Sequence, residues 1–256
     1  MSALLSTVRD LHRRKARERR ALALLEGIRL VEEALAARIT FTGVVAAPAL
    51  DATPRGKALR EALLAATIPI EAATDAELVE LADTEHPQGV LAVVSPKMWV
   101  AADIKVSAAH PVVVLDGVQD PGNVGTIART ALALGVAGLV ALPGTADLLN
   151  PKVLRGSMGA LFHLPALHMS DPEFLEWART AGLELWTSSV DGEDIRSIRP
   201  PIAPVALILG NEGAGIRAEL ASASVRRVAV PIVAGTESLN VAVAAGILLH
   251  EVTRGR

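Results

Sequence analysis

Short, uninterrupted apolar runs in the second half of the chain constrain the fold more than any other feature. The clearest are residues 112–115, 138–142 and 205–209, and another begins at Val228. They have the length of strands and show no polar alternation, which is typical of a parallel sheet covered on both faces. Helical patterns lie between them, as at residues 172–181. The sequence therefore predicts an α/β fold with an open, mostly parallel sheet.

The first 95 residues form a separate, smaller alternation of helices and strands. Residues 6–38 predict one helix with a basic first part, and residues 41–46 predict a strand. Periodicity is lost between residues 96 and 110. The sequence thus predicts a small α/β domain over residues 1–95, a linker over residues 96–110 and a second domain over residues 111–256.

The composition excludes several classes of site. A net charge of −3 argues against a generally basic nucleic-acid binder, and three Trp, three Phe and no Tyr are too few for a base-stacking platform. The chain has no cysteine, and its six histidines lack metal-ligand spacing, so we expect no disulfide and no metal. No apolar run approaches the roughly 18 residues of a membrane span, and the first residues do not resemble a secretory signal. We therefore expect a cytoplasmic protein without a membrane partner.

Charge is concentrated near the N-terminus. Six cations occupy eight consecutive positions, and these are Arg13, Arg14, Lys15, Arg17, Arg19 and Arg20. Such a run forms either a solvated helix face or an arm that touches nucleic-acid phosphates.

Three polar, glycine-rich loops follow predicted strands, at residues 116–123, 210–215 and 234–240. The carboxyl ends of parallel strands meet at one edge of a sheet, and ligands bind there in open α/β folds. The three loops therefore predict one composite site. In the third loop, polar residues crowd the start of an apolar helix, where they either cap it or form the floor of that site.

The helix after the first loop carries Asn123 and Arg129. Six positions separate them, nearly two helical turns, so both side chains can face the same side. The residues around Arg129 are apolar, and an arginine in a largely buried helix is either paired or functional.

Three segments together resemble the motifs of the SpoU (TrmH-like) family of RNA ribose 2′-O-methyltransferases, in the SPOUT class. They read LDGVQDPGNVGTIART at residues 115–130, LILGNEGAGI at 207–216 and VPIVAGTESLNVAVAAG at 230–246. Their order and separation match the family's, and the resemblance covers residues 111–256. The segments EGIRLVEE at 26–33 and QGVLA at 88–92 are similar to the substrate-binding domain that many members carry.

The resemblance implies a C-terminal trefoil knot that binds S-adenosyl-L-methionine, and a homodimer with the site near the subunit interface. It also implies roles for individual residues. Carried over by motif, the catalytic residues are Arg129, Asn123, Glu212, Ser238 and Asn240, and the cofactor contacts are Gly210, Val230, Ile232 and Leu239.

The implied reaction is methylation of a ribose 2′-hydroxyl in RNA. The family assigns Arg129 as the general base, but a guanidinium stays protonated in nearly all protein settings, so stabilisation of the developing alkoxide is equally open. The N-terminal domain and the basic cluster favour ribosomal RNA over transfer RNA. A non-catalytic RNA-binding or assembly factor and a nucleotide-dependent enzyme on an ordinary doubly wound sheet remain as alternatives, although the dinucleotide fingerprint is missing.

Overall fold

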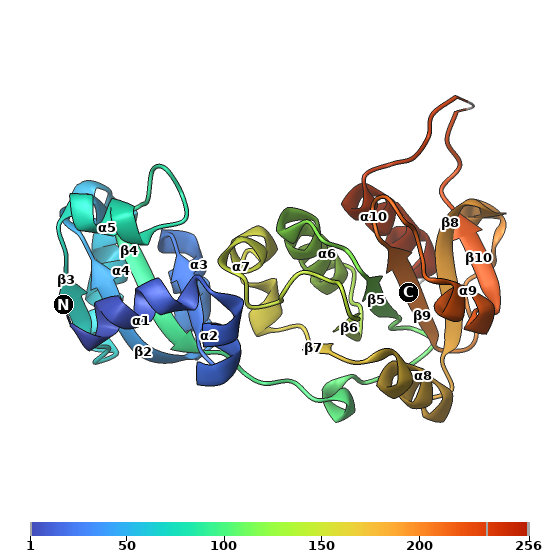
Figure 1. Ribbon diagram of the computed structural model, residues 1–256, viewed down its shortest axis with the longest axis horizontal. Helices are drawn as coiled ribbons and strands as arrows, with labels where there is room; N and C mark the ends of the chain where they lie inside the picture. Colours follow the sequence, from blue (N-terminus) through green and yellow to red (C-terminus); the bar gives the residue numbers. More distant parts are fainter. Residues whose placement is uncertain (1, 234, 255–256) are drawn as a thin grey trace. The chain divides into compact units, whose positions relative to one another are not determined.

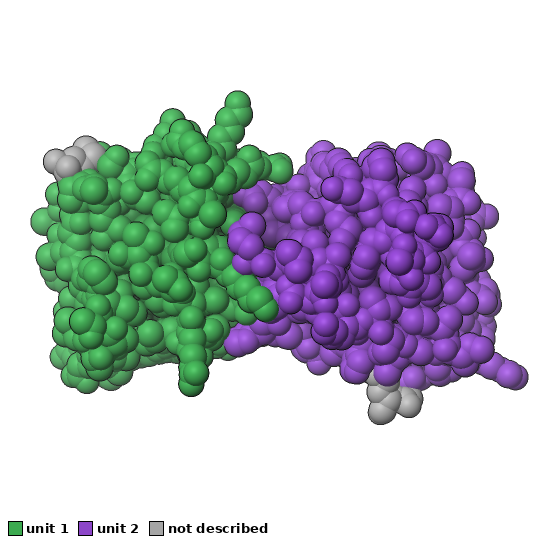
Figure 2. Space-filling view, turned by 90° about the horizontal axis from the view of Figure 1, so that it is seen from below, with its two compact units in different colours: residues 1–97, 149–162 green, residues 98–148, 163–256 purple. Residues whose placement is uncertain are grey.

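The computed structural model describes residues 2–233 and 235–254, and the chain divides into two compact units (Figures 1 and 2). The first comprises Met1–Lys97 and Leu149–Phe162, and the second comprises Met98–Leu148 and His163–Arg256. A segment from the second half of the sequence therefore belongs to the first unit. The domain boundaries expected at residues 96–110 stay a prediction.

The first unit contains a four-stranded sheet of order β1-β4-β2-β3 (Figure 1). Strand β4 (Val90–Ser95) lies between β1 (Ala23–Glu26) and β2 (Thr40–Ala46) and is antiparallel to both, whereas β3 (Ile70–Ala72) is parallel to β2. The other elements are α1 (Ala3–Leu11), α2 (Arg14–Arg20), α3 (Ile28–Ala36), η1 (Pro48–Ala52), α4 (Pro54–Ala65), α5 (Asp75–Leu81), α7 (Pro151–Ser157) and η3 (Ala160–Phe162).

The single helix predicted over residues 6–38 is wrong. The segment contains α1, α2 and α3 with strand β1 between the last two. Ala21, the residue after helix α2, is left-handed with φ 51°, and Gly27, the residue before α3, has φ 98°. All four residues of β1 are buried, and Leu24 lies opposite Val93 of β4. Pairing with a strand distant in sequence therefore overrides the helical spacing of the leucines.

Residues 149–162 are attached to this unit by burial and by charge. Val153 and Leu154 of α7 are buried. The guanidinium of Arg155 donates to Asp83 at 2.8 Å and to Glu26 at 3.3 Å. Glu26 is almost completely buried at the end of β1, so Arg155 supplies a counter-charge that a buried carboxylate needs.

The second unit is built on a six-stranded sheet of order β10-β8-β9-β5-β6-β7, in which every neighbouring pair is parallel. The prediction of an open, mostly parallel α/β sheet is confirmed. The strands are β5 (Val112–Asp116), β6 (Gly138–Ala141), β7 (Ala166–His168), β8 (Glu184–Asp194), β9 (Val205–Gly210) and β10 (Arg226–Ala229).

Helices cover this sheet, and its central strands carry continuous apolar side chains. All residues of β5, β6 and β9 are buried, as the uninterrupted runs predict. The helical elements are η2 (Ala101–Asp103), α6 (Pro121–Ala133), α8 (Asp171–Thr180), η4 (Ile195–Ser197), α9 (Ala218–Ala223) and α10 (Val241–Val252). Within the described residues, no helix has both the length and the apolar character needed to cross a membrane.

Candidate active site

Two of the three polar loops leave neighbouring strands at the same edge of the sheet. Strands β5 and β9 pair in parallel with Asp116 opposite Gly210, so the loops that follow start side by side. The side chain of Asn211 donates to the carbonyl oxygen of Gly117 at 2.8 Å. The loops at residues 116–123 and 210–215 are therefore fastened together at their base.

The loop at residues 210–215 folds back on itself. Asn211 and Gly215 exchange backbone hydrogen bonds of 3.0 Å in both directions, and the Asn211 side-chain oxygen accepts from Gly213 and Ala214 at 2.9 Å. A Cβ on Gly210 would lie 2.5 Å from the carbonyl carbon of Gly215, closer than real side chains approach. This close approach of two backbone segments requires glycine at position 210.

Glu212 bridges the two loops with its carboxylate. It accepts from the backbone N–H groups of Gln119 at 3.3 Å and Asp120 at 3.4 Å, and from the side-chain amide of Asn123 at 3.0 Å. Burial raises the pKa of Glu212, but these hydrogen bonds stabilise the carboxylate more strongly, and the pKa lies below its ordinary value. Glu212 is therefore ionised at neutral pH and acts as an acceptor.

Asn123 and Asn240 extend this bridge to the third loop. The amide of Asn240 donates to the side-chain oxygen of Asn123 at 3.0 Å, and its own oxygen accepts from Ala242 at 2.9 Å and Val243 at 3.2 Å. Asn240 is thus the N-cap of α10, one of the two roles that the sequence leaves open for the polar residues of the third loop. Glu212, Asn123 and Asn240 form one chain of hydrogen bonds from three segments distant in sequence.

Arg129 and Ser238 are the predicted catalytic residues that lie outside this chain of hydrogen bonds. Arg129 is exposed on α6, although Val124, Ile127 and Ala128 of the same helix are buried. Ser238 is exposed on residues 235–240, which precede α10. Neither side chain hydrogen-bonds to another residue within 2–233 and 235–254.

Comparison with known protein families shows which family the chain belongs to. Residues 110–250 match the model of the SpoU rRNA Methylase family, which is more than half of the chain. The chain belongs to the SpoU rRNA methylase family. Residues 5–92 match a second model, the MRM3-like substrate binding domain.

Relatives of this SpoU methylase align with it in sequence or superpose on it in structure over nearly its whole length. It is 35% identical to the 23S rRNA (guanosine(2553)-2′-O)-methyltransferase RlmP of Bacillus subtilis, over 94% of this chain and 92% of the relative. The crystal structure of an AdoMet-bound rRNA methyltransferase from Sinorhizobium meliloti superposes with a TM-score of 0.86 at 29% identity, covering 99% and 95% of the two chains. The SpoU methyltransferase AviRb from Streptomyces viridochromogenes, solved with AdoMet, also gives 0.86, at 28% identity and 99% and 98% coverage.

The cofactor contacts expected in the SpoU methylase lie on two segments. Gly210 is buried at the end of β9, whereas Val230 and Ile232 are half-buried after β10, and Leu239 is half-buried next to Asn240. Their assignment to cofactor binding stays a prediction.

The basic cluster divides into structural and solvent-facing cations. Arg17 is buried and donates to the carbonyl oxygens of Leu11 at 2.8 Å and His12 at 2.9 Å. Arg13 and Arg20 pair with Asp10, and Arg14 pairs with Glu18. Lys15 and Arg19 are exposed and form no ion pair within the part of the chain that the structure describes.

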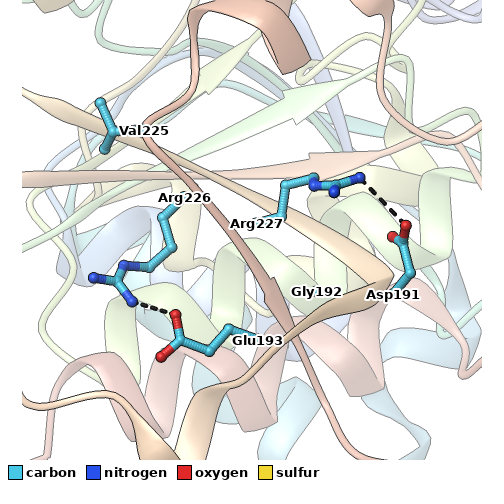
Figure 3. Close-up of a pocket in the computed structure, with 6 residues that line it drawn as sticks. All are labelled: Asp191, Gly192, Glu193, Val225, Arg226 and Arg227. Carbon is cyan, nitrogen blue, oxygen red and sulfur yellow. Dashed lines mark hydrogen bonds and ion pairs between the residues drawn. The ribbon is translucent and has the colours of Figure 1, made fainter.

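An open hollow lies where β8 and β10 meet, and no predicted site residue lines it (Figure 3). The register of the pairing between β8 and β10 shifts there. A Cβ added to Gly192 would lie 2.6 Å from the carbonyl carbon of Val228, so the two backbones approach closely. The two arginines of the hollow are neutralised, because Arg226 pairs with Glu193 and Arg227 pairs with Asp191. The described residues contain no group of three or more potential metal ligands.

Sequence reasoning missed the residues that hold the loops, above all Asn211, which bonds to Gly117, and Arg217, which pairs with Asp116. A carboxylate at a strand end, Asp116, was a signal that a basic partner should lie nearby, because a buried charge is paired. The sequence does not say which of its twenty arginines fills that place.

Proposed function

We propose that this protein transfers a methyl group from S-adenosylmethionine to a ribose 2′-hydroxyl of 23S ribosomal RNA. The observation that carries the proposal is the hydrogen-bonded chain of Glu212, Asn123 and Asn240, which unites the three family motifs at one edge of the sheet. The relatives reported above align over nearly the full chain, including the substrate-binding domain, and the names of the Bacillus subtilis and Sinorhizobium meliloti proteins specify rRNA.

The residues at the loops fit S-adenosylmethionine. Apolar, half-buried side chains at Val230, Ile232 and Leu239 suit the adenosine moiety, and the glycines leave backbone groups accessible. A Cβ added at Gly215 would meet nothing within 4 Å, so a ligand can approach the backbone there. When bound, the cofactor supplies a methyl group already activated by a positively charged sulfur.

The protein's own residues align the acceptor ribose and manage its proton. As the 2′-oxygen forms its bond to the methyl carbon, the carbon–sulfur bond breaks and the hydroxyl proton leaves. The exposed Arg129 side chain either accepts that proton as a neutral guanidine, or stays a guanidinium and stabilises the developing negative charge on the oxygen while the proton passes to solvent water. We propose that Ser238, exposed on the segment before α10, contributes its hydroxyl to this group.

A homodimer is part of the proposal, and an apolar surface on α6 and α10 supports it. The two helices pack closely, because a Cβ on Gly246 would lie 3.7 Å from the methyl group of Thr130. Leu132 on α6 and Val243 and Ile247 on α10 are 37%, 53% and 39% exposed. Large exposed apolar side chains on adjoining helices are typical of protein interfaces. Light scattering should give a dimer mass, and Val243→Asp should give a monomer.

The remaining features follow from the family. We propose that the C-terminal segments form the trefoil knot, that residues 1–95 bind the RNA through exposed cations such as Lys15 and Arg19, and that the enzyme works in the cytoplasm, where ribosomes are assembled.

The decisive experiment maps 2′-O-methylated nucleotides in 23S rRNA from cells with and without the gene. One methylation should disappear and return with the wild-type protein, but not with Arg129→Ala. If rRNA methylation is unchanged and purified protein methylates neither 23S rRNA nor transfer RNA, the non-catalytic RNA-binding alternative replaces this proposal.

A further inference from the structure

The loop that carries Glu212 is held mainly by polar contacts. Residues 212–215 are exposed, so little apolar packing fixes their position. One end of the loop is fixed where Gly210 pairs with Asp116 in the sheet. The other end is Arg217, immediately before α9.

Arg217 joins three elements through its guanidinium. Its Nε donates to Asp116 Oδ1 at 2.6 Å, and its backbone N–H donates to Asp116 Oδ2 at 2.8 Å. Its two terminal nitrogens donate to the two oxygens of Asp171, at 2.5 and 2.8 Å. The end of β5, the start of α8 and the end of the Glu212 loop therefore meet at one side chain.

Only an arginine can make this set of contacts. The guanidinium presents donors in a rigid planar fork, whereas a lysine ammonium is a single point of charge on a flexible stem. Asp116 is 1% exposed, so loss of its partner would leave a buried carboxylate with one backbone hydrogen bond. The hydrogen bonds that Arg217 donates to Asp171 raise its pKa most; burial lowers it, but the hydrogen bond to Asp116 and the two carboxylate charges raise it further, so the side chain stays a cation.

We propose that Arg217 is a positioning residue for methyl transfer, which places the loop of Gly210 and Glu212 for the cofactor and the ribose. This inference rests on the proposed function. Arg217 acts at a distance, because it holds the loop whose Glu212 orients Asn123, and Asn123 in turn contacts Asn240. A displaced loop should therefore impair cofactor binding and turnover together.

The first test measures affinity for S-adenosylmethionine by calorimetry, and kcat and KM on 23S rRNA. Arg217→Gln and Arg217→Lys should each weaken cofactor binding by roughly tenfold or more and lower kcat, because the fork is lost in both. The matched control is Arg179→Gln, since Arg179 forms a similar two-bonded pair with Glu176 on the exposed side of α8. Its cofactor affinity should change by less than about twofold.

A second variant separates positioning from stability. In Arg217→Gln/Asp116→Asn, the buried charge is removed together with its partner, so thermal stability should recover toward the wild-type value. Cofactor affinity should stay low, because the fork is still absent. If affinity returns with stability, Arg217 has a purely structural role and the inference is overturned.

Hydrogen exchange gives a readout that does not need the cofactor. The backbone N–H groups of Gln119 and Asp120 donate to Glu212, so their exchange reports the loop's position. They should exchange faster in Arg217→Gln than in the wild type, and unchanged exchange overturns the inference. Wild-type protein that binds no S-adenosylmethionine would instead refute the proposed function, and the exchange result would still decide the role of Arg217.

Discussion

Asn123→Asp would place a second carboxylate against Glu212. In the wild type, the Asn123 amide nitrogen lies 3.0 Å from Glu212 Oε1 and donates to it. The substitution keeps the size of the side chain but replaces a donor with an acceptor. At neutral pH, two negative charges would then face each other across the loops that form the candidate site.

The distance sets the size of the effect. Two unit charges 3.0 Å apart repel by about 1.4 kcal/mol in bulk water and by about 5 kcal/mol at an effective dielectric of 20. Glu212 is partly exposed, and the loops can move apart, so the lower part of this range applies. With the lost hydrogen bond, we expect Asn123→Asp to lower the free energy of unfolding by about 2–3 kcal/mol near pH 8.

The same repulsion predicts a dependence on pH. It raises the pKa of one carboxyl of the pair above its value in the unfolded chain. A group with a raised pKa stabilises the fold below its unfolded pKa, and this contribution is lost as pH rises through the folded pKa. Near pH 5, the protonated carboxyl can donate to the other carboxylate and replace the amide. At that pH, the free energy of unfolding of Asn123→Asp should therefore be only about 1 kcal/mol below that of the wild type.

Asn123→Ala is the matched control, because it removes the donor without adding a charge. Its loss relative to the wild type should be about 1 kcal/mol at both pH values. Urea unfolding of the three proteins near pH 5 and pH 8 measures these differences. If the loss in Asn123→Asp is the same at both pH values, the carboxylate of Glu212 is not held against position 123, and the site geometry is wrong.

Four other substitutions test the loop and the first unit. Gly210→Ala should abolish cofactor binding, measured by calorimetry, because its methyl would lie 2.5 Å from the backbone of Gly215. Arg17→Ala should lower the free energy of unfolding by about 1–3 kcal/mol, because the buried carbonyl oxygen of Leu11 loses the donor that Arg17 supplies. Lys15 is exposed, so Lys15→Ala should leave the free energy of unfolding unchanged and weaken RNA binding in a filter assay. Glu26→Ala should lower the free energy of unfolding, measured by thermal unfolding, by about 3 kcal/mol or more. The buried carboxylate accepts hydrogen bonds from two backbone N–H groups and pairs with an arginine.

The sheet of the second unit was readable from sequence because its strands are apolar on both faces. Residues 112–115 and 205–209 are short apolar runs without polar alternation, which is typical of buried parallel strands. The N-terminal helix was misread because the leucines at 22, 24 and 25 fit helix and strand equally. Pairing of Leu24 with Val93 decides between them, and this contact is invisible in the local sequence.

The sequence predicts at which edge of the sheet the site lies, but not which side chains hydrogen-bond to one another there. Loops at the ends of parallel strands must converge, which brought Asn123, Glu212 and Asn240 to one edge before any contact was known. The donors and acceptors depend on cap geometry that spacing does not encode. Arg217 and Asp116 lie 101 positions apart, so their pairing could not be read from either motif alone.

The polar residues at the start of α10 can be interpreted either as a helix cap or as the floor of a site. Asn240 fits both interpretations. The oxygen of Asn240 caps the helix, while its nitrogen donates to Asn123. Asn240→Asp separates the two roles, because aspartate caps a helix as well as asparagine and its charge suits a helix N-terminus, but it cannot donate. We expect its stability to remain within about 1 kcal/mol of the wild type while methyl transfer is lost, whereas Asn240→Ala should lose about 1 kcal/mol as well as activity. An Asn240→Asp enzyme with normal turnover would show that the residue is a cap alone, and that the hydrogen bond to Asn123 contributes nothing to the reaction.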